Sequence, residues 1–175
     1  MAVNVVLASC LLGAWYFFIY RTPVTKVLSQ TRPAPDFVLT DLNLDKNAST
    51  KPISLKDLKG RVIFLHFWAS WCTTCRTEMS ELNALNAQLQ GRAVNFIGIA
   101  TSDRAEDVRE LLKSVHFPFR VLLDFDGTVA DAFKVNAIPQ TFILDSQGFI
   151  RYHVQGPLRS YHLDDIRALV TDLGA

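Results

Sequence analysis

Two apolar segments near the middle of the chain predict the interior of a β-sheet. Residues 62–69 read Val-Ile-Phe-Leu-His-Phe-Trp-Ala, and residues 94–99 read Val-Asn-Phe-Ile-Gly-Ile. Both are rich in β-branched and aromatic residues, as strands buried on both faces usually are. We therefore expect two buried strands, of which residues 62–69 form the central one.

Apolar residues at helical spacing follow each of these strands. The first helix is expected to start at residue 72 and to stop at Gly91. The second is expected to start at Asp103, which has Glu106 three residues later as in a capping box. Their apolar faces are formed by Met79, Leu82, Leu85, Ala87 and Leu89 in the first helix and by Val108, Leu111, Leu112 and Val115 in the second.

Shorter patterns predict two hairpins and the remaining elements. One hairpin joins residues 37–39 to 53–55 through a polar stretch, and the other joins residues 141–144 to 149–154 through Ser146-Gln-Gly148. The remaining elements are a strand at 121–123, a helix at 128–133 and a last helix with Asp164 and Asp165 in its first turn. Strands that alternate with helices and close on a hairpin predict one α/β domain over residues 35–175, with a mixed central sheet flanked by helices.

Cys72 and Cys75 lie where the central strand passes into the first helix. Free backbone N–H groups and the positive end of the helix dipole stabilise a thiolate there and lower the pKa of Cys72. The three-residue spacing puts the sulfur of Cys75 on the same face, within reach of a disulfide. The arrangement predicts a dithiol–disulfide redox pair in which Cys72 is the more exposed thiol and Cys75 the more buried one.

Two other interpretations of the cysteine pair fit the sequence less well. A structural zinc site needs about four ligands, but the sequence has no second cysteine pair and no histidine pair near this one. A structural disulfide across two residues closes too small a loop to stabilise a fold much. The third cysteine, Cys10, lies far from the pair, so a disulfide-stapled scaffold is not expected.

The N-terminal segment predicts a membrane anchor. Residues 2–20 carry no charge and end in aromatic residues followed by Arg21, an arrangement that suits a membrane interface. A helix of this length spans about 28 Å at about 1.5 Å per residue, close to the hydrocarbon thickness of a bilayer. We expect a transmembrane helix at residues 1–21 and a polar linker at residues 22–34.

Two other interpretations of the N-terminal segment compete with a membrane anchor. Leu-Ala-Ser-Cys10 resembles a lipoprotein signal, and the segment could also be a cleaved secretory signal, but no basic residue precedes the apolar run. The basic residues Arg21, Lys26 and Arg32 all follow it, so the positive-inside bias alone would leave the domain in the cytoplasm.

The charge balance argues against nucleic acid as a partner. The 175 residues include 18 Lys and Arg against 17 Asp and Glu, and no basic run appears. The length is enough for one domain of about 140 residues and an appendage.

Several motifs together resemble one family. They are Phe67-Trp-Ala-Ser-Trp-Cys-Thr-Thr-Cys75 with Glu78, then Ile138-Pro-Gln-Thr-Phe-Ile-Leu-Asp145, and then Gly156-Pro-Leu158. From about Pro35 to Leu173 the chain resembles the thioredoxin fold, and within it the membrane-tethered TlpA/ResA/CcmG (DsbE)-like thiol–disulfide oxidoreductases. The resemblance implies a thioredoxin fold with an N-terminal β-hairpin extension. The chain departs from the family at Thr74, where a proline is usual; the residues between the cysteines tune the reduction potential.

The resemblance also implies roles for the residues around the cysteines. Cys72 corresponds to the attacking nucleophile and Cys75 to the resolving thiol. Glu78 matches an acidic residue thought to help move protons near the dithiol, although its spacing also fits a solvated charge on a helix face. His66 stands where thioredoxins carry a buried acid, so a proton relay competes there with a hydrogen-bonded core histidine.

Two further positions are expected to contact the substrate. Pro139 matches the family's cis-proline, which lies against the cysteines and leaves the backbone of Ile138 free to pair with an extended substrate segment. Trp71 is expected to shield the disulfide.

The sequence thus predicts a membrane-anchored thiol–disulfide oxidoreductase that needs no cofactor or metal. The resemblance implies reduction of extracytoplasmic proteins such as apocytochrome c, a domain facing the periplasm from the inner membrane, and a membrane electron donor. For the orientation, it outweighs the positive-inside signal. A peroxiredoxin-like peroxidase is one alternative, but the Pro-x-x-x-Thr/Ser-x-x-Cys stretch of that class is missing before Cys72. A copper-delivery or adaptor module that binds Cu(I) through the two thiolates is another.

Overall fold

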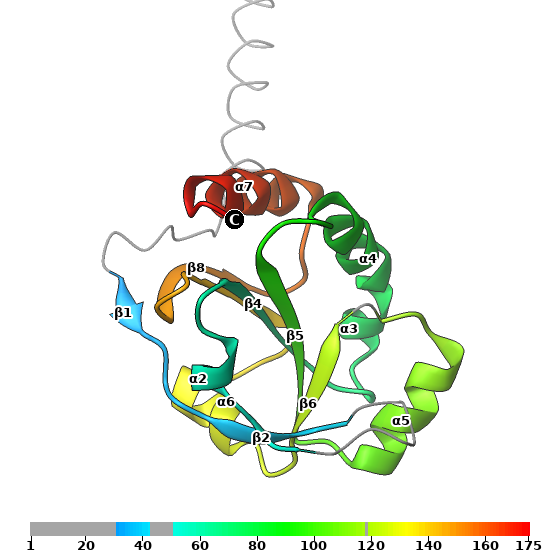
Figure 1. Cartoon of the computed structure of the whole chain (residues 1–175). Helices are drawn as coiled ribbons and strands as arrows, with labels where there is room; N and C mark the ends of the chain where they lie inside the picture. Colours follow the sequence, from blue (N-terminus) through cyan, green and yellow to red (C-terminus); the bar gives the residue numbers. More distant parts are fainter. Residues whose placement is uncertain (1–30, 43–50, 118) are drawn as a thin grey trace, which may run out of the picture.

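Eight strands form a mixed sheet at the centre of the computed structural model, which describes residues 31–42, 51–117 and 119–175 (Figure 1). The strands are β1 (Arg32–Pro33), β2 (Val38–Asp41), β3 (Ile53–Ser54), β4 (Val62–Trp68), β5 (Val94–Thr101), β6 (Arg120–Asp124), β7 (Gln140–Leu144) and β8 (Phe149–Gln155). Their order is β1-β8-β7-β4-β5-β6-β2-β3, with β4, β5 and β6 parallel and the other pairs antiparallel. The predicted mixed sheet with a central strand at residue 62 onwards is therefore confirmed.

Six helices of the described residues flank this sheet. They are α2 (Leu55–Leu58), α3 (Thr73–Thr77), α4 (Met79–Gln88), α5 (Ala105–Ser114), α6 (Thr128–Phe133) and α7 (Ser160–Asp172). Helices α2 and α6 cover one face, and α3, α4, α5 and α7 cover the other (Figure 1). This arrangement of helices around a mixed sheet is the expected thioredoxin fold.

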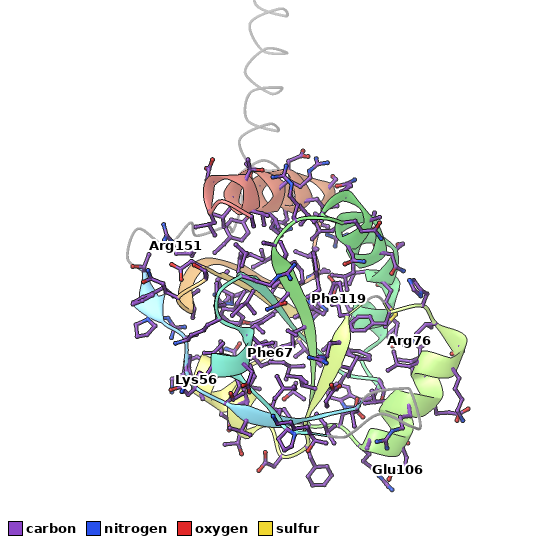
Figure 2. The ribbon with its side chains drawn as sticks, viewed as in Figure 1. Lys56, Phe67, Arg76, Glu106, Phe119 and Arg151 are labelled. Carbon is purple, nitrogen blue, oxygen red and sulfur yellow. A yellow bond between two sulfur atoms is a disulfide. The ribbon has the colours of Figure 1, made fainter. Side chains whose placement is uncertain are left out.

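Alternation along β4 divides the core between the two faces. Ile63, Leu65 and Phe67 pack with the apolar residues of α2 and α6, whereas Val62 and Phe64 pack with those of α4 and α7. Figure 2 labels Phe67 in the first of these clusters and Phe119 in the second. Because side chains alternate along a strand, His66 points to the same face as Phe64, toward the helices that follow the cysteines.

Both predicted hairpins are present. In the N-terminal one, Val38 pairs with Ser54 and Leu39 with Ile53, while the connection at residues 43–50 lies outside the described residues. Strands β7 and β8 pair around the turn at Ser146-Gln-Gly148, with a shift in register between Ile143 and Leu144. In addition, Arg32 and Pro33, at the end of the expected linker, form β1 along the edge of β8.

The helix expected to start at residue 72 and to stop at Gly91 is interrupted at Glu78, which separates α3 from α4. The hydroxyl of Thr77 donates to the carbonyl of Thr74 at 2.8 Å, and this is the carbonyl that the Glu78 N–H would use in a regular helix. That N–H turns to the carbonyl of Arg76 instead. A threonine hydroxyl that bonds to a carbonyl of the preceding turn commonly bends a helix. The prediction of one continuous helix was therefore wrong, because the Thr77 hydroxyl competes with the Glu78 N–H for the Thr74 carbonyl.

Two predicted helix starts also differ from the structure. Helix α5 begins at Ala105 with Arg104 as its N-cap, because most of the bonding capacity of Asp103 is used elsewhere. Helix α7 begins at Ser160, so Asp164 lies in its second turn, and Asp165 beside it accepts the Tyr152 hydroxyl at 3.0 Å.

The expected membrane anchor at residues 1–21 lies outside the described residues. In the part of the chain that is described, no helix combines the length and apolar character needed to cross a bilayer.

Candidate active site

The two cysteines form a disulfide at the start of α3. Cys72 is the N-cap residue of this helix, its sulfur is bonded to that of Cys75, and the two Cα atoms lie 5.3 Å apart. The sulfur of Cys72 also accepts the backbone N–H of Cys75 at 3.1 Å. Cys72 is 8% exposed and Cys75 1%. The structure thus confirms the predicted position of the pair and the greater exposure of Cys72.

The loop before Cys72 is tied to the turn that follows β5. The carboxylate of Asp103 accepts hydrogen bonds from the Ser70 backbone N–H at 2.5 Å and from the Ser70 hydroxyl at 2.9 Å. The indole N–H of Trp71 donates to the carbonyl of Ser102 at 3.1 Å. From the sequence, Asp103 was expected only as a helix start, because the local pattern is the same whether its carboxylate caps a helix or binds a distant loop.

Trp71 projects outward beside the disulfide. Its side chain is 62% exposed, and with Ser102, Asp131 and Ile138 it lines a cleft of about 450 Å³. A large aromatic surface left open to solvent at the mouth of a cleft is typical of a surface that contacts a partner.

Glu78 is buried, not solvated on a helix face. The residue is 2% exposed, and one carboxylate oxygen accepts the backbone N–H of Leu158 at 2.7 Å. The other oxygen faces Nε2 of His66 at 3.4 Å. The bend between α3 and α4 therefore places this carboxylate inside the protein, one helical turn beyond Cys75.

His66 joins Glu78 to β7. The residue is 1% exposed, and its Nδ1 lies 3.0 Å from the hydroxyl of Thr141, its neighbour in the β4–β7 register. In the tautomer that carries its proton on Nε2, the ring accepts from Thr141 and directs its N–H toward Glu78. His66 is thus a hydrogen-bonded core histidine that also touches the one acidic group expected to move protons.

A further histidine lies near this buried pair. Burial lowers the pKa of His162, and Arg159 acts in the same direction, whereas the negative charges of Asp165 and Glu78 oppose the shift. The Glu78 carboxylate therefore interacts with Leu158, just before α7, and with His162 in the first turn of that helix.

The segment before β7 contains the expected cis-proline. The Ile138–Pro139 peptide bond is cis, and the carbonyl of Pro139 accepts the backbone N–H of Gly156 at 2.9 Å. The side chain of Gln140 donates to the carbonyl of Ala137 at 2.9 Å. Ile138 packs against the apolar cluster that contains both cysteines, so this segment borders the part of the core that holds the disulfide.

The described residues bring together no group of three His, Cys, Asp or Glu side chains that could hold a metal ion. The histidines are single, and the two cysteines are bonded to each other.

The chain is similar to a protein family and to several thiol–disulfide oxidoreductases. Residues 31–153 match the model of the AhpC/TSA family. The thiol–disulfide oxidoreductase ResA of Bacillus subtilis is 31% identical over 143 residues, which cover 82% of this chain and 76% of ResA. ResA of Bacillus thuringiensis is 29% identical over 170 residues, which cover 96% of this chain and 95% of that one.

A solved structure agrees with these relatives. A protein from Chlorobium tepidum, described as a thiol:disulfide interchange protein DsbE, superposes with a TM-score of 0.71 at 25% identity over 83% of this chain and 98% of that chain. The disulfide at the helix start, the cis-proline segment and these similarities agree with one another. The chain belongs to the AhpC/TSA family and, within it, to the ResA-like thiol–disulfide oxidoreductases.

Proposed function

We propose that this protein is a membrane-tethered reductase of protein disulfides that works outside the cytoplasm. The observation that carries the proposal is the Cys72–Cys75 disulfide at the N-terminus of α3, with the more exposed sulfur beside an open cleft. The names of the relatives give the chemical class of the reaction.

The exchange follows from the positions of the two sulfurs. In the reduced protein, the thiolate of Cys72 attacks one sulfur of a substrate disulfide, and the other substrate sulfur leaves with the bonding electrons and takes up a proton. The thiolate of Cys75 then attacks Cys72 in the mixed disulfide and releases the second substrate thiol. The protein is left with the Cys72–Cys75 disulfide, and a membrane dithiol donor supplies two electrons and two protons to restore it.

The groups around the disulfide have separate roles in this scheme. Trp71, Ile138 and Pro139 contact the extended substrate segment beside the cysteines. The buried pair of Glu78 and His66 accepts the proton that Cys75 must lose before it attacks. A general base must be held in a fixed position to take up a proton in this way. The hydrogen bonds from Leu158 and Thr141 supply that positioning.

The location and the substrate complete the proposal. The uncharged segment at residues 2–20 supports a single membrane anchor, and the resemblance to TlpA/ResA/CcmG-like proteins supports a domain on the periplasmic side that reduces apocytochrome c or other secreted thiol proteins.

A turnover assay tests the proposed chemistry. The full-length chain in detergent is supplied with insulin as a protein disulfide and dithiothreitol as the reductant. We expect reduction to depend on both Cys72 and Cys75, with no comparable consumption of hydrogen peroxide. Peroxide consumption without disulfide reduction would favour the peroxidase alternative, and copper retained through purification would favour the copper-delivery alternative.

A further inference from the structure

The loop that carries Cys72 is held in place by four residues, which we call the loop clamp: Ser70, Trp71, Ser102 and Asp103. Three hydrogen bonds join its two sides, two from Ser70 to the Asp103 carboxylate and one from the Trp71 indole to the Ser102 carbonyl. Asp103 is only 4% exposed. A buried carboxylate is costly unless its oxygens are bonded, so these contacts are strongly favoured over an open loop.

The Ser102 side of the clamp is fixed by its own backbone. Ser102 has a φ of +49°, in the left-handed region that a serine rarely adopts. Its N–H donates to the carbonyl of Asp124 at 2.9 Å, which ties the turn to the end of β6. Such conformations persist where the surroundings impose them, and they concentrate at functional sites.

Asp103 is shared between a helix and the active-site loop. It precedes α5 and accepts the N–H of Arg104 at 2.8 Å, yet both of its oxygens also bind Ser70, two residues before the nucleophile. Trp71, between Ser70 and Cys72, is held by its hydrogen bond to the Ser102 carbonyl. The N–H of Cys72 itself donates to the carbonyl of Ala69 at 3.2 Å. Little freedom is left for the backbone that directs the sulfur of Cys72.

We propose that Asp103 is a positioning residue for the dithiol, which acts through Ser70 to keep the sulfur of Cys72 at the N-terminus of α3. The inference rests on the proposed disulfide exchange, because a sulfur at a helix N-terminus ionises at lower pH and so attacks faster at neutral pH. A loop released from Asp103 lets the sulfur drift from the helix end and lose that advantage.

The test is the pH dependence of Cys72 alkylation in the reduced full-length chain. Iodoacetamide labelling is followed by mass spectrometry of the separate peptides, so that Cys10 and Cys75 are counted apart. We expect Asp103→Asn to move the midpoint of Cys72 labelling upward by about one pH unit, which makes labelling near neutral pH about tenfold slower. Ser70→Ala removes one of the two hydrogen bonds and should produce a smaller shift in the same direction.

Asp145→Asn provides a matched control. The Asp145 carboxylate also accepts two backbone N–H groups, from Gln147 and Phe149, and it contacts Arg151. It follows Leu144, which pairs with the first residues of β4, so it lies at the end of the sheet opposite Trp68 and the cysteines. We expect this variant to lose stability and to leave the labelling midpoint of Cys72 unchanged.

The possible outcomes separate the alternatives. Unchanged midpoints in both Asp103→Asn and Ser70→Ala would overturn the inference. A downward shift would overturn it too, since it would show that the negative charge of Asp103 outweighs its hydrogen bonds. If Asp103→Asn does not fold, the result for Ser70→Ala decides alone. The Ser70 side chain is only partly buried, so its loss should leave the fold intact. Labelling needs no disulfide substrate, so this result stands or falls independently of the turnover assay.

Discussion

The Glu78 carboxylate and the His66 imidazole face each other at 3.4 Å in the protein interior, one helical turn beyond Cys75. Leu158 and Thr141 fix the far side of each group through hydrogen bonds of 2.7 and 3.0 Å. Both side chains are almost fully buried, so few other polar groups compete for this contact. Glu78 follows Cys75 by one helical turn, and this short separation along the chain is the reason to test whether the pair influences thiol reactivity.

The first prediction concerns this pair. Glu78→Gln keeps the shape of the side chain and a hydrogen-bond acceptor for Leu158 but removes the charge, and His66→Gln removes the imidazole. We expect both to change the pH dependence of cysteine alkylation in the reduced protein, by an amount on the order of one pH unit, since each removes an ionisable side chain from the pair that we propose accepts the proton of Cys75. Circular dichroism checks that the fold is retained.

Glu110→Gln is the control for Glu78→Gln. Glu110 is an exposed helix residue paired with Lys113, and its loss should not alter the alkylation profile. If the Glu78 and His66 variants titrate like the unaltered protein, both residues have structural roles only.

Much of the site could be predicted from local sequence, because the signals are local. Cys72 and Cys75 directly follow a buried strand. The cis bond before Pro139 was expected because this proline, which precedes a strand, matches the cis-proline of the family. The sequence left open whether Glu78 lies inside the protein or is a solvated charge, since its inward direction depends on the bend at Thr77. The contact of His66 with Thr141 needs the register between β4 and β7, which joins residues far apart in sequence. Asp103 was misassigned because capping and binding to Ser70 use the same residue type.

The second prediction concerns stability in acid. Burial lowers the pKa of His153 to about 4, and Arg32 contributes in the same direction. The ring stacks on Phe142 with the centroids 4.0 Å apart, and its Nε2 lies 2.8 Å from Oε1 of Gln140. The unfolded chain takes up this proton near the usual value of 6.5 and the folded chain only near 4. The titration of His153 therefore leaves the free energy of unfolding unchanged above pH 6.5 and lowers it increasingly as the pH falls toward 4.

His153→Gln removes that titration. The free energy of unfolding of the unaltered protein should fall relative to that of His153→Gln between pH 6.5 and 4, by about 1–2 kcal/mol once solvent screening of this half-buried ring is allowed for. Urea unfolding at several pH values measures the difference, with the exposed His116→Gln as control. A difference that stays constant with pH would refute the argument.

The third prediction concerns topology. Residues 2–20 carry no charge, and the basic residues Arg21, Lys26 and Arg32 follow them. The proposed orientation, with the domain in the periplasm, is opposite to the one that the positive-inside bias favours. Three charges on a short flank give only a weak bias. Reporters fused after Ala175 should be active when they need the periplasm and silent when they need the cytoplasm, and deletion of residues 2–20 should release the fusion from the membrane. The reverse pattern of reporter activity would place the domain in the cytoplasm.

The different roles of the two cysteines are the central claim, and Cys75→Ser tests it most directly. Cys72 is the more exposed sulfur, at the helix N-terminus, and the sequence holds no third cysteine other than Cys10. The variant should therefore attack substrates through Cys72 and accumulate mixed disulfides, visible on a non-reducing gel and lost on reduction. The same gel of Cys72→Ser should show none. Mixed disulfides that form through Cys75 in Cys72→Ser, or turnover by Cys75→Ser at the rate of the unaltered protein, would contradict the assignment of nucleophile and resolving thiol.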